Sequence, residues 1–149
     1  MAVEYALTLA GETPIDQVAW RALPEPADRP TGTPPLLAAD LYERYGFEVT
    51  VLAGRRGYVD VATDRGRWEW EPERFVSVDF RMAKDADQEW AVVNMVSCVW
   101  RVLESGPEDA AVALNGDLLL LTRLDGVLVK HNRAGWWASY PATNAVFPD

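Results

Sequence analysis

The chain has 149 residues, which suits one domain of ordinary size, and we expect residues 1–149 to form a single domain. Hydrophobic residues make up 49% of it, enough for a real core and too many for a disordered chain. The formal net charge of −9 argues against nucleic acid or an anionic membrane as the partner, because both require a basic footprint. The charge is compatible with a basic protein partner, or with a role in solubility alone.

Cys98 is the only cysteine, which excludes an internal disulfide and a thiolate metal cluster. Residues 1–7 have neither the basic start nor the long apolar core of a signal peptide. No run of residues approaches the roughly 18 consecutive apolar residues of a membrane span. The sequence therefore predicts a cytoplasmic protein.

The first predicted elements are a strand and a helix. Alternation of apolar and polar residues over residues 3–10 predicts a half-buried strand, which Gly11 ends. A helix is predicted next, with Thr13 as its cap, Pro14 at its first position and Pro24 as its stop. Its buried stripe at helical spacing consists of Ile15, Val18, Ala19, Ala22 and Leu23.

A proline-rich stretch follows. Five prolines lie between residues 23 and 35, which are therefore predicted to form a loop. The next ten residues, 36–45, are predicted to form a short helix that ends at Gly46.

Short strands dominate the middle of the chain. Residues 47–52 and 58–62 are predicted to form strands. They are joined around Gly54-Arg55-Arg56-Gly57, which is predicted to be a turn. Residues 67–71 form a third predicted strand, after a turn. Residues 75–82 form a fourth, whose apolar face consists of Val76, Val78, Phe80 and Met82.

A long helix is predicted after these strands. Residues 85–89 are acidic, which suits a helix start because the macrodipole favours negative charge there. The helix is expected to run to about Ser105, where Gly106-Pro107 stops it. Its buried stripe consists of Val92, Val93, Val96, Val99, Trp100 and Leu103.

Two hairpin signals define a three-stranded meander over residues 108–133. Asn115-Gly116 and Asp125-Gly126 each separate apolar runs and supply the positive φ that type I′ turns need. The resulting register pairs Leu114 with Asp117, Val112 with Leu119, Leu124 with Val127, and Thr122 with Val129. The face expected on the core carries Ala111, Ala113, Leu118, Leu120, Leu124, Val127 and Val129. The other face, expected to be partly covered, carries Val112, Leu114, Leu119 and Leu121 beside Asp117, Arg123 and Lys130.

These elements add up to about eight or nine strands and two main helices, with residues 136–140 as a short strand or covering segment. Hairpins dominate, and strands do not alternate regularly with helices. The sequence therefore predicts an α+β fold, a mainly antiparallel sheet with the two helices packed on one face.

No group of residues predicts catalysis. His131 is the only histidine, and no nucleophile-elbow pattern surrounds any of the candidate serines, Ser77, Ser97, Ser105 and Ser139. Residues 85–89 lack the central glycine and distal glutamate of a calcium loop, and residues 54–57 lack a Walker lysine pattern. Cys98 is expected to be a buried, inert thiol. We therefore predict no catalytic residue, no metal site and no cofactor.

The strand at residues 67–71 is the candidate partner-binding surface. Alternation places Trp68 and Trp70 on one face and Arg67, Glu69 and Glu71 on the other. If the tryptophans face the core, the carboxylates form an exposed row that attracts a basic partner. The open alternatives are a plainly solvated face, a glycosidase-like carboxylate pair, or a strand turned the other way with its acids buried. The predicted binding residues are Asp64, Glu69, Glu71 and Glu73, together with Trp68 and Trp70.

The chain resembles actinobacterial members of the swarming-inhibition (Sit) immunity-protein family over nearly its whole length. The resemblance lies in VEYALTLAG at residues 3–11, DLYERYGF at 40–47, WEWEP at 68–72 and LVKH at 128–131, followed by Trp136-Trp137. It implies a small cytoplasmic protein, not an enzyme, that binds and neutralises a cognate toxin delivered between neighbouring bacterial cells. The family pattern assigns no catalytic or binding residues to this chain.

Two alternatives remain open at this point. One is a small enzyme or ligand-binding domain with a pocket lined by Trp68, Trp70, Trp100, Trp136 and Trp137. The other is a homodimer formed through the half-apolar face of the meander, at Val112, Leu114, Leu119 and Leu121.

Overall fold

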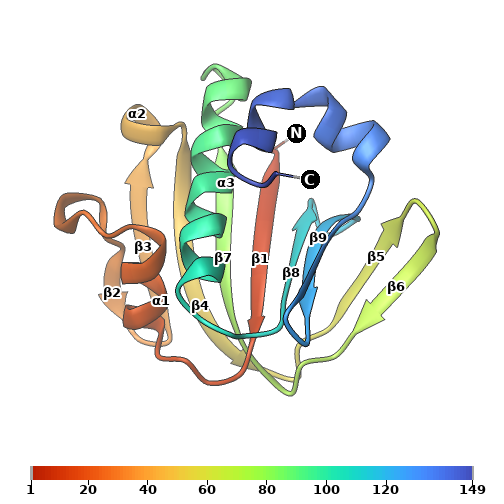
Figure 1. Ribbon diagram of the computed structural model, residues 1–149. Helices are drawn as coiled ribbons and strands as arrows, with labels where there is room; N and C mark the ends of the chain where they lie inside the picture. The colour runs from red at the N-terminus through yellow and green to blue at the C-terminus, as the bar shows by residue number, and fades with distance from the viewer. Residues whose placement is uncertain (1, 149) are drawn as a thin grey trace.

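A ten-stranded sheet organises the molecule (Figure 1). The computed structural model describes residues 2–148. The strands follow the order β2-β3-β4-β7-β1-β8-β9-β5-β6, and β10 also pairs with β9. Neighbours are antiparallel except β5 and β9, which share one parallel bridge. The strands are β1 (Glu4–Ala10), β2 (Thr31–Thr33), β3 (Leu36–Leu41), β4 (Phe47–Arg55), β5 (Val59–Thr63), β6 (Gly66–Trp70), β7 (Arg74–Met82), β8 (Ala110–Leu114), β9 (Leu118–Leu124) and β10 (Val127–Lys130).

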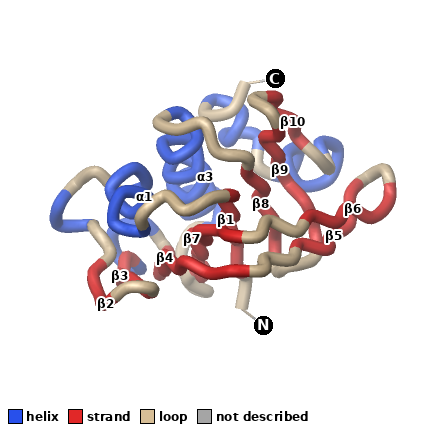
Figure 2. The backbone as a smooth tube through the Cα atoms, turned by 90° about the horizontal axis from the view of Figure 1, so that it is seen from below, coloured by secondary structure: helices blue, strands red, loops and turns tan. Residues whose placement is uncertain are grey.

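Two main helices cover one face of this sheet, as Figures 1 and 2 show. α1 (Ile15–Ala22) packs against α3 (Gln88–Glu104). The predicted α+β class, with a mainly antiparallel sheet and two main helices on one face, is confirmed. The shorter helical turns are η1 (Pro26–Asp28), α2 (Tyr42–Tyr45), η2 (Arg133–Trp137) and η3 (Pro141–Ala145). No helix within residues 2–148 combines the length and the apolar character that crossing a bilayer demands.

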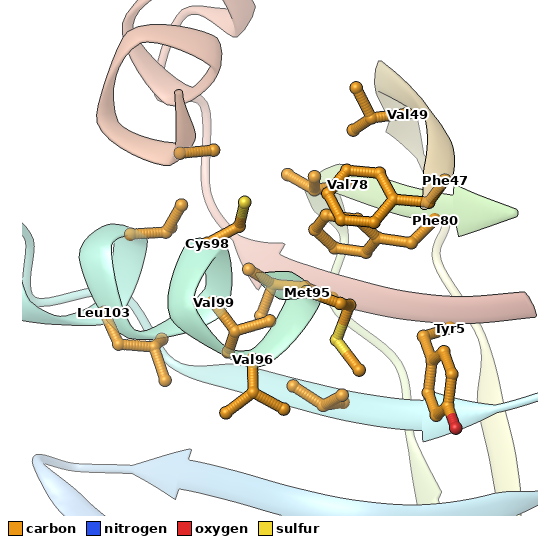
Figure 3. Packing of buried hydrophobic residues seen from close by; sticks show 14 of the residues in the cluster. Tyr5, Phe47, Val49, Val78, Phe80, Met95, Val96, Cys98, Val99 and Leu103 are labelled. Carbon is orange, nitrogen blue, oxygen red and sulfur yellow. The ribbon is translucent and has the colours of Figure 1, made fainter. Parts of the chain in front are cut away.

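The main core lies between α3 and the central strands (Figure 3). Alternate residues of β1 and β7 point at the helices, as the sequence pattern predicted. Phe47 and Phe80 meet edge to face, with ring centroids 5.0 Å apart. Side chains of this kind contribute roughly 1.5–3 kcal/mol each when they are fully buried. The buried set includes Tyr5, Leu7 and Leu9 from β1, Val76, Val78, Phe80 and Met82 from β7, and Met95, Val96, Cys98, Val99 and Leu103 from α3.

Residues 23–46 depart from the prediction, because β2 and β3 lie where a loop and a short helix were expected. Only Tyr42–Tyr45 is helical, and Gly46 ends this turn with φ 89°, as predicted. β3 pairs with β4 along its whole length. Hydrogen bonds to that neighbouring strand therefore override the helical propensity of the leucines and alanines in β3.

A polar network joins α1 to the chain that follows α3. Arg21 donates to both carboxylate oxygens of Glu108, at 2.6 and 2.8 Å, and to the carbonyl of Val102 at 2.5 Å. Thr13 was predicted to cap α1 but instead donates its hydroxyl to Glu108 at 2.8 Å, and α1 has no side-chain cap. The hydrogen bonds from Arg21 lower the pKa of Glu108 to about 2, although burial acts in the opposite direction.

One long hairpin runs from β4 to β7 and includes β5 and β6 at its far end. The last pair of the β4–β7 ladder is Arg55 with Arg74, and the first pair of the β5–β6 ladder is Val59 with Trp70. The register is therefore continuous across the gap between the two ladders. β4 and β5 do not pair with each other, so residues 54–57 form a corner in this hairpin rather than a turn between paired strands.

The corner depends on glycine. Across it, the amides of Arg56 and Gly57 donate to carbonyls of the opposite strand at 2.6 and 2.8 Å. A Cβ atom on Gly54 would lie 2.6 Å from the ring of Phe75, and one on Gly57 would lie 2.9 Å from both Phe75 and Pro72. The ring of Phe75 therefore packs against both glycine backbones, which explains why glycine stands at these two positions.

The meander forms as predicted, but the register of its first hairpin was wrong. The pairs between β9 and β10, Leu124 with Val127 and Thr122 with Val129, agree with the prediction. Between β8 and β9 the register shifts at a bulge, which leaves Leu120 without a partner. The observed pairs are Val112 with Leu121 rather than Leu119, and Leu114 with Leu118 rather than Asp117.

The shifted register changes which face of the meander lies on the core. Val112, Leu120 and Leu121 belong to the main core, whereas Ala111, Ala113 and Leu119 form a second buried cluster on the other face. The face considered for a homodimer is therefore covered within the molecule, with Leu114 half-buried. Val127 and Val129 were predicted to face the core but are 62% and 42% exposed.

Candidate functional site

The hairpin arm, which is β5, β6 and the turn between them, carries most of the predicted binding residues. Its inner face consists of Val59, Val61, Trp68 and Trp70, which pack against the cluster formed by Ala111, Ala113 and Leu119. The two tryptophan rings stack with their centroids 5.8 Å apart and an interplanar angle of 29°. Both rings are half-buried, so the tryptophans face the molecule and Glu69 faces solvent.

The outer strip of the arm is the opposite face, formed by Tyr58, Asp60, Arg67, Glu69 and Glu71. An ion pair joins Arg67 Nη2 to Asp60 Oδ1 at 2.7 Å and neutralises one of the three carboxylates. Glu69 and Glu71 are exposed and carry the remaining negative charge. The outer strip is therefore an acidic surface on a rigid strand pair.

Tyr58 is the residue of this surface that sequence reasoning missed. Its side chain is 59% exposed, and its hydroxyl donates to Glu69 Oε1 at 3.3 Å. Alternation in the predicted strand at residues 58–62 places Tyr58 on the same face as Asp60, so this signal was available in the sequence. Exposed tyrosines are among the residues that most often dominate binding energy in protein interfaces.

The other two predicted acids lie at opposite ends of the arm. Asp64 is exposed in the turn at the tip, and Glu73 is exposed at the corner. The carbonyl of Glu73 accepts from the amide of Arg56, so arginine side chains and Glu73 share the corner. The six predicted residues therefore belong to one part of the structure, but they do not share one face.

His131 lies near the tip of the arm, at the end of β10. Its Nε2 atom is 2.9 Å from the hydroxyl of Thr122. Burial lowers the pKa of His131, while the charge of Asp64 acts to raise it and that of Arg65 to lower it. The four candidate serines direct their hydroxyls elsewhere: Ser77 to Asp79, and Ser97, Ser105 and Ser139 to the carbonyls of Val93, Arg101 and Gly135.

The five tryptophans considered as a pocket lining do not line one cavity. Trp136 and Trp137 are buried in the main core, whereas Trp68 and Trp70 pack in the second cluster. Trp100 is 37% exposed and meets Phe147 edge to face. The cavity beside Trp136 and Trp137 has a volume of only about 10 Å³, close to the least that one water molecule needs.

Cys98 is buried in α3, as predicted. Burial raises its pKa to about 11, against the effect of Arg101, whose Nη2 atom donates to Sγ at 3.2 Å. A thiol with so high a pKa is a poor nucleophile at neutral pH. Within residues 2–148, no three histidine, cysteine, aspartate or glutamate side chains gather as they would around a metal ion.

The face of the sheet opposite the helices carries a second group of acids. The register places Arg81 between Glu48 and Glu4 on the neighbouring strands. Burial raises the pKa of Asp79 in the next row, although the hydroxyl of Ser77 acts to lower it. These residues border a hollow of about 320 Å³. Glu48 and Asp79 are half-buried there, whereas Glu69 and Glu71 are exposed, so the outer strip is the more available acidic surface.

Comparison with known proteins gives a family but no close relative. No curated protein and no solved structure matches the chain. The sequence does match the family model described as SitI3-like, and the match covers residues 3–141. These residues include all ten strands and both main helices. The chain therefore belongs to the SitI3-like family of immunity proteins.

Proposed function

We propose that this protein acts in the cytoplasm as an immunity protein, which binds a cognate bacterial toxin and neutralises it by stoichiometric occlusion, without catalysis. The observation that carries the proposal is the SitI3-like match over residues 3–141. The surroundings of His131 support it, because the four serines direct their hydroxyls elsewhere and the hydroxyl beside His131 belongs to Thr122, which is only 4% exposed.

The outer strip of the hairpin arm, with Asp64 and Glu73 at its ends, is the surface we assign to the toxin. Glu69 and Glu71 are exposed on a strand whose other face is anchored by Trp68 and Trp70, so their positions are fixed. A fixed negative surface speeds encounter with a basic partner. Tyr58 supplies apolar area that such a complex would bury.

The first experiment tests the function itself. Co-expression with the toxin encoded beside this gene should restore growth, and an inactivated toxin should co-purify with this protein in a one-to-one complex. Growth that is not restored, together with the absence of a complex, would refute the proposed function.

The second experiment tests the surface. The double variant Glu69→Lys/Glu71→Lys should slow association with the toxin about tenfold at low salt and make the rate less dependent on salt. Its melting temperature should change little, because both side chains are exposed. The matched control is Glu43→Lys/Glu89→Lys, which changes the net charge equally at exposed positions on α2 and α3. Equal rates for the two variants would place the contact surface elsewhere.

A further inference from the structure

Three strands in residues 2–148 have a free edge, and only one of the three is unprotected. β2 is three residues long and lies between Pro30 and Pro34, while β6 carries Arg67 and Glu69. β10, by contrast, presents three consecutive aliphatic residues, Val127, Leu128 and Val129, which are 62%, 42% and 42% exposed. Natural sheets usually guard their edges with charge, proline or short strands, because an open apolar edge pairs with other chains. β10 has only four residues, and its single charged residue, Lys130, stands at the end, so its first three residues form an open apolar edge.

The backbone of β10 is oriented to accept a further strand. The Asp125-Gly126 turn has φ values of 51° and 79°, and Leu124 pairs with Val127 directly beside it. In an antiparallel ladder, residues alternate between facing their partner and facing away. Leu128 therefore directs its amide and carbonyl away from β9, towards the free edge.

The space beside β10 is bounded by the hairpin arm. β5 and β10 add to the same side of β9, since Ala62 pairs with Leu118 and Lys130 pairs with Leu121 further along. Figure 2 shows β10 and the β5–β6 hairpin both next to β9, at the end of the sheet away from β2 and β3. We call the free edge of β10, beside the tip of the arm, the open slot.

The two ends of the β10 edge differ in charge. At one end, β10 closes with Lys130, and both Asp64 and Arg65 of the arm's tip are close enough to His131 to influence its pKa. At the other end, Asp125 is exposed in the turn, and Asp109 accepts a hydrogen bond from the amide of Asp125 at 2.9 Å. A strand that pairs with this edge would therefore meet an apolar stretch and one negative end, at Asp125. The net charge of −9 makes a second copy of this chain a poor occupant, because the two copies repel each other.

We propose that the free edge of β10 receives an extended strand of the toxin, which has apolar residues at its centre and a basic residue at the end that meets Asp125. This inference rests on the proposed function, and it names the mode of recognition as strand addition. The outer strip and the open slot meet at the tip of the arm, so one partner can contact both. The acids then govern the rate of encounter, and the added strand governs how long the complex lasts.

Hydrogen exchange on the unmodified protein gives the most direct test, with the inactivated toxin encoded by the adjacent gene as the probe. The amide of Leu128 should exchange at least about tenfold more slowly in the complex, because it donates to the added strand. The double variant Val127→Lys/Val129→Lys should weaken the complex at least about tenfold, chiefly through faster dissociation. The matched control is Leu36→Lys/Leu52→Lys, a cross-strand pair of leucines 47% and 37% exposed at the far end of the sheet.

The outcomes separate this inference from the function on which it rests. A complex that forms without protecting Leu128, and that the variant and its control affect equally, overturns strand addition and leaves the proposed function standing. Failure of the unmodified protein to bind toxin overturns the function itself. Light scattering tests whether a second copy of this chain occupies the slot. A dimer that the Val127→Lys/Val129→Lys variant abolishes would assign the slot to that copy and overturn the inference.

Discussion

Replacement of Glu108 by glutamine should remove a large part of the stability of this protein at neutral pH. The carboxylate ordinarily has a pKa of 4.5, and hydrogen bonds from Arg21 hold it at about 2 in the folded chain. At about 1.36 kcal/mol per pH unit, this difference corresponds to roughly 3 kcal/mol of folding free energy. The side chains of Arg21 and Glu108 are only 14% and 10% exposed, so solvent screens little of it. We expect Glu108→Gln to cost about 2–3 kcal/mol at pH 7.

The contribution of the Glu108 carboxylate to the folding free energy should depend on pH. The pKa is lower in the folded state, so the contribution is complete above about pH 4.5 and is lost as the pH falls towards 2. Urea denaturation of the wild type and Glu108→Gln between pH 7 and pH 3 should therefore show a difference that shrinks with acidity. Glu104→Gln, at an exposed position of α3, serves as the control and should match the wild type throughout. A difference that is independent of pH would refute the role assigned to the ionised carboxylate.

Three further predictions concern single side chains. Gly57→Ala should cost about 1–3 kcal/mol in urea denaturation, since its Cβ atom would meet Phe75 at the corner, and Phe75→Leu should recover part of the loss. Wild-type stability in Gly57→Ala would show that the corner has room. Tyr45→Phe should cost about 1–2 kcal/mol, because it removes a 2.5 Å hydrogen bond to Asp28, which is only 3% exposed; an unchanged melting temperature would contradict this. Tyr58→Ala should speed dissociation of the toxin complex without changing the melting temperature, and an unchanged dissociation rate would place Tyr58 outside the interface.

Periodicity in the sequence was sufficient to predict the elements that bury one clear face. The alternation in β1 and β7 predicted the residues that fill the core, because it follows a period of 2 over a long stretch. The helical stripe of α3 was right for Val92, Val96, Val99 and Leu103 but wrong for Trp100, which is 37% exposed. The helix predicted over residues 36–41 was wrong, because no clear period marks this segment. Leucine and alanine there suit a helix, and only pairing with β4, a distant contact, makes the segment a strand.

The candidate site was predicted in part. Alternation separated Trp68 and Trp70 from Glu69, but the side that faces the molecule depends on the corner at residues 54–57, which brings the arm to the far edge of the sheet. The exposure of Val127 depends on the bulge at Leu120. A single inserted residue moves the side chains that follow it to the other face, and a turn dipeptide gives no sign of it.

The central place of β1 in the sheet has a consequence for how the chain is made. Leu7 pairs with Val78 on one side and with Val112 on the other, so β1 leaves the ribosome long before either neighbour has been translated. The hairpin of residues 47–82 can form as soon as it has been translated, since its strands are joined by its own turn. We therefore expect this hairpin to form early, β1 to pair with β7 next, and the other edge of β1 to stay open until β8 has emerged. Until α3 has emerged, the apolar face of β1 is uncovered, and nascent chains would be most vulnerable to aggregation during this interval.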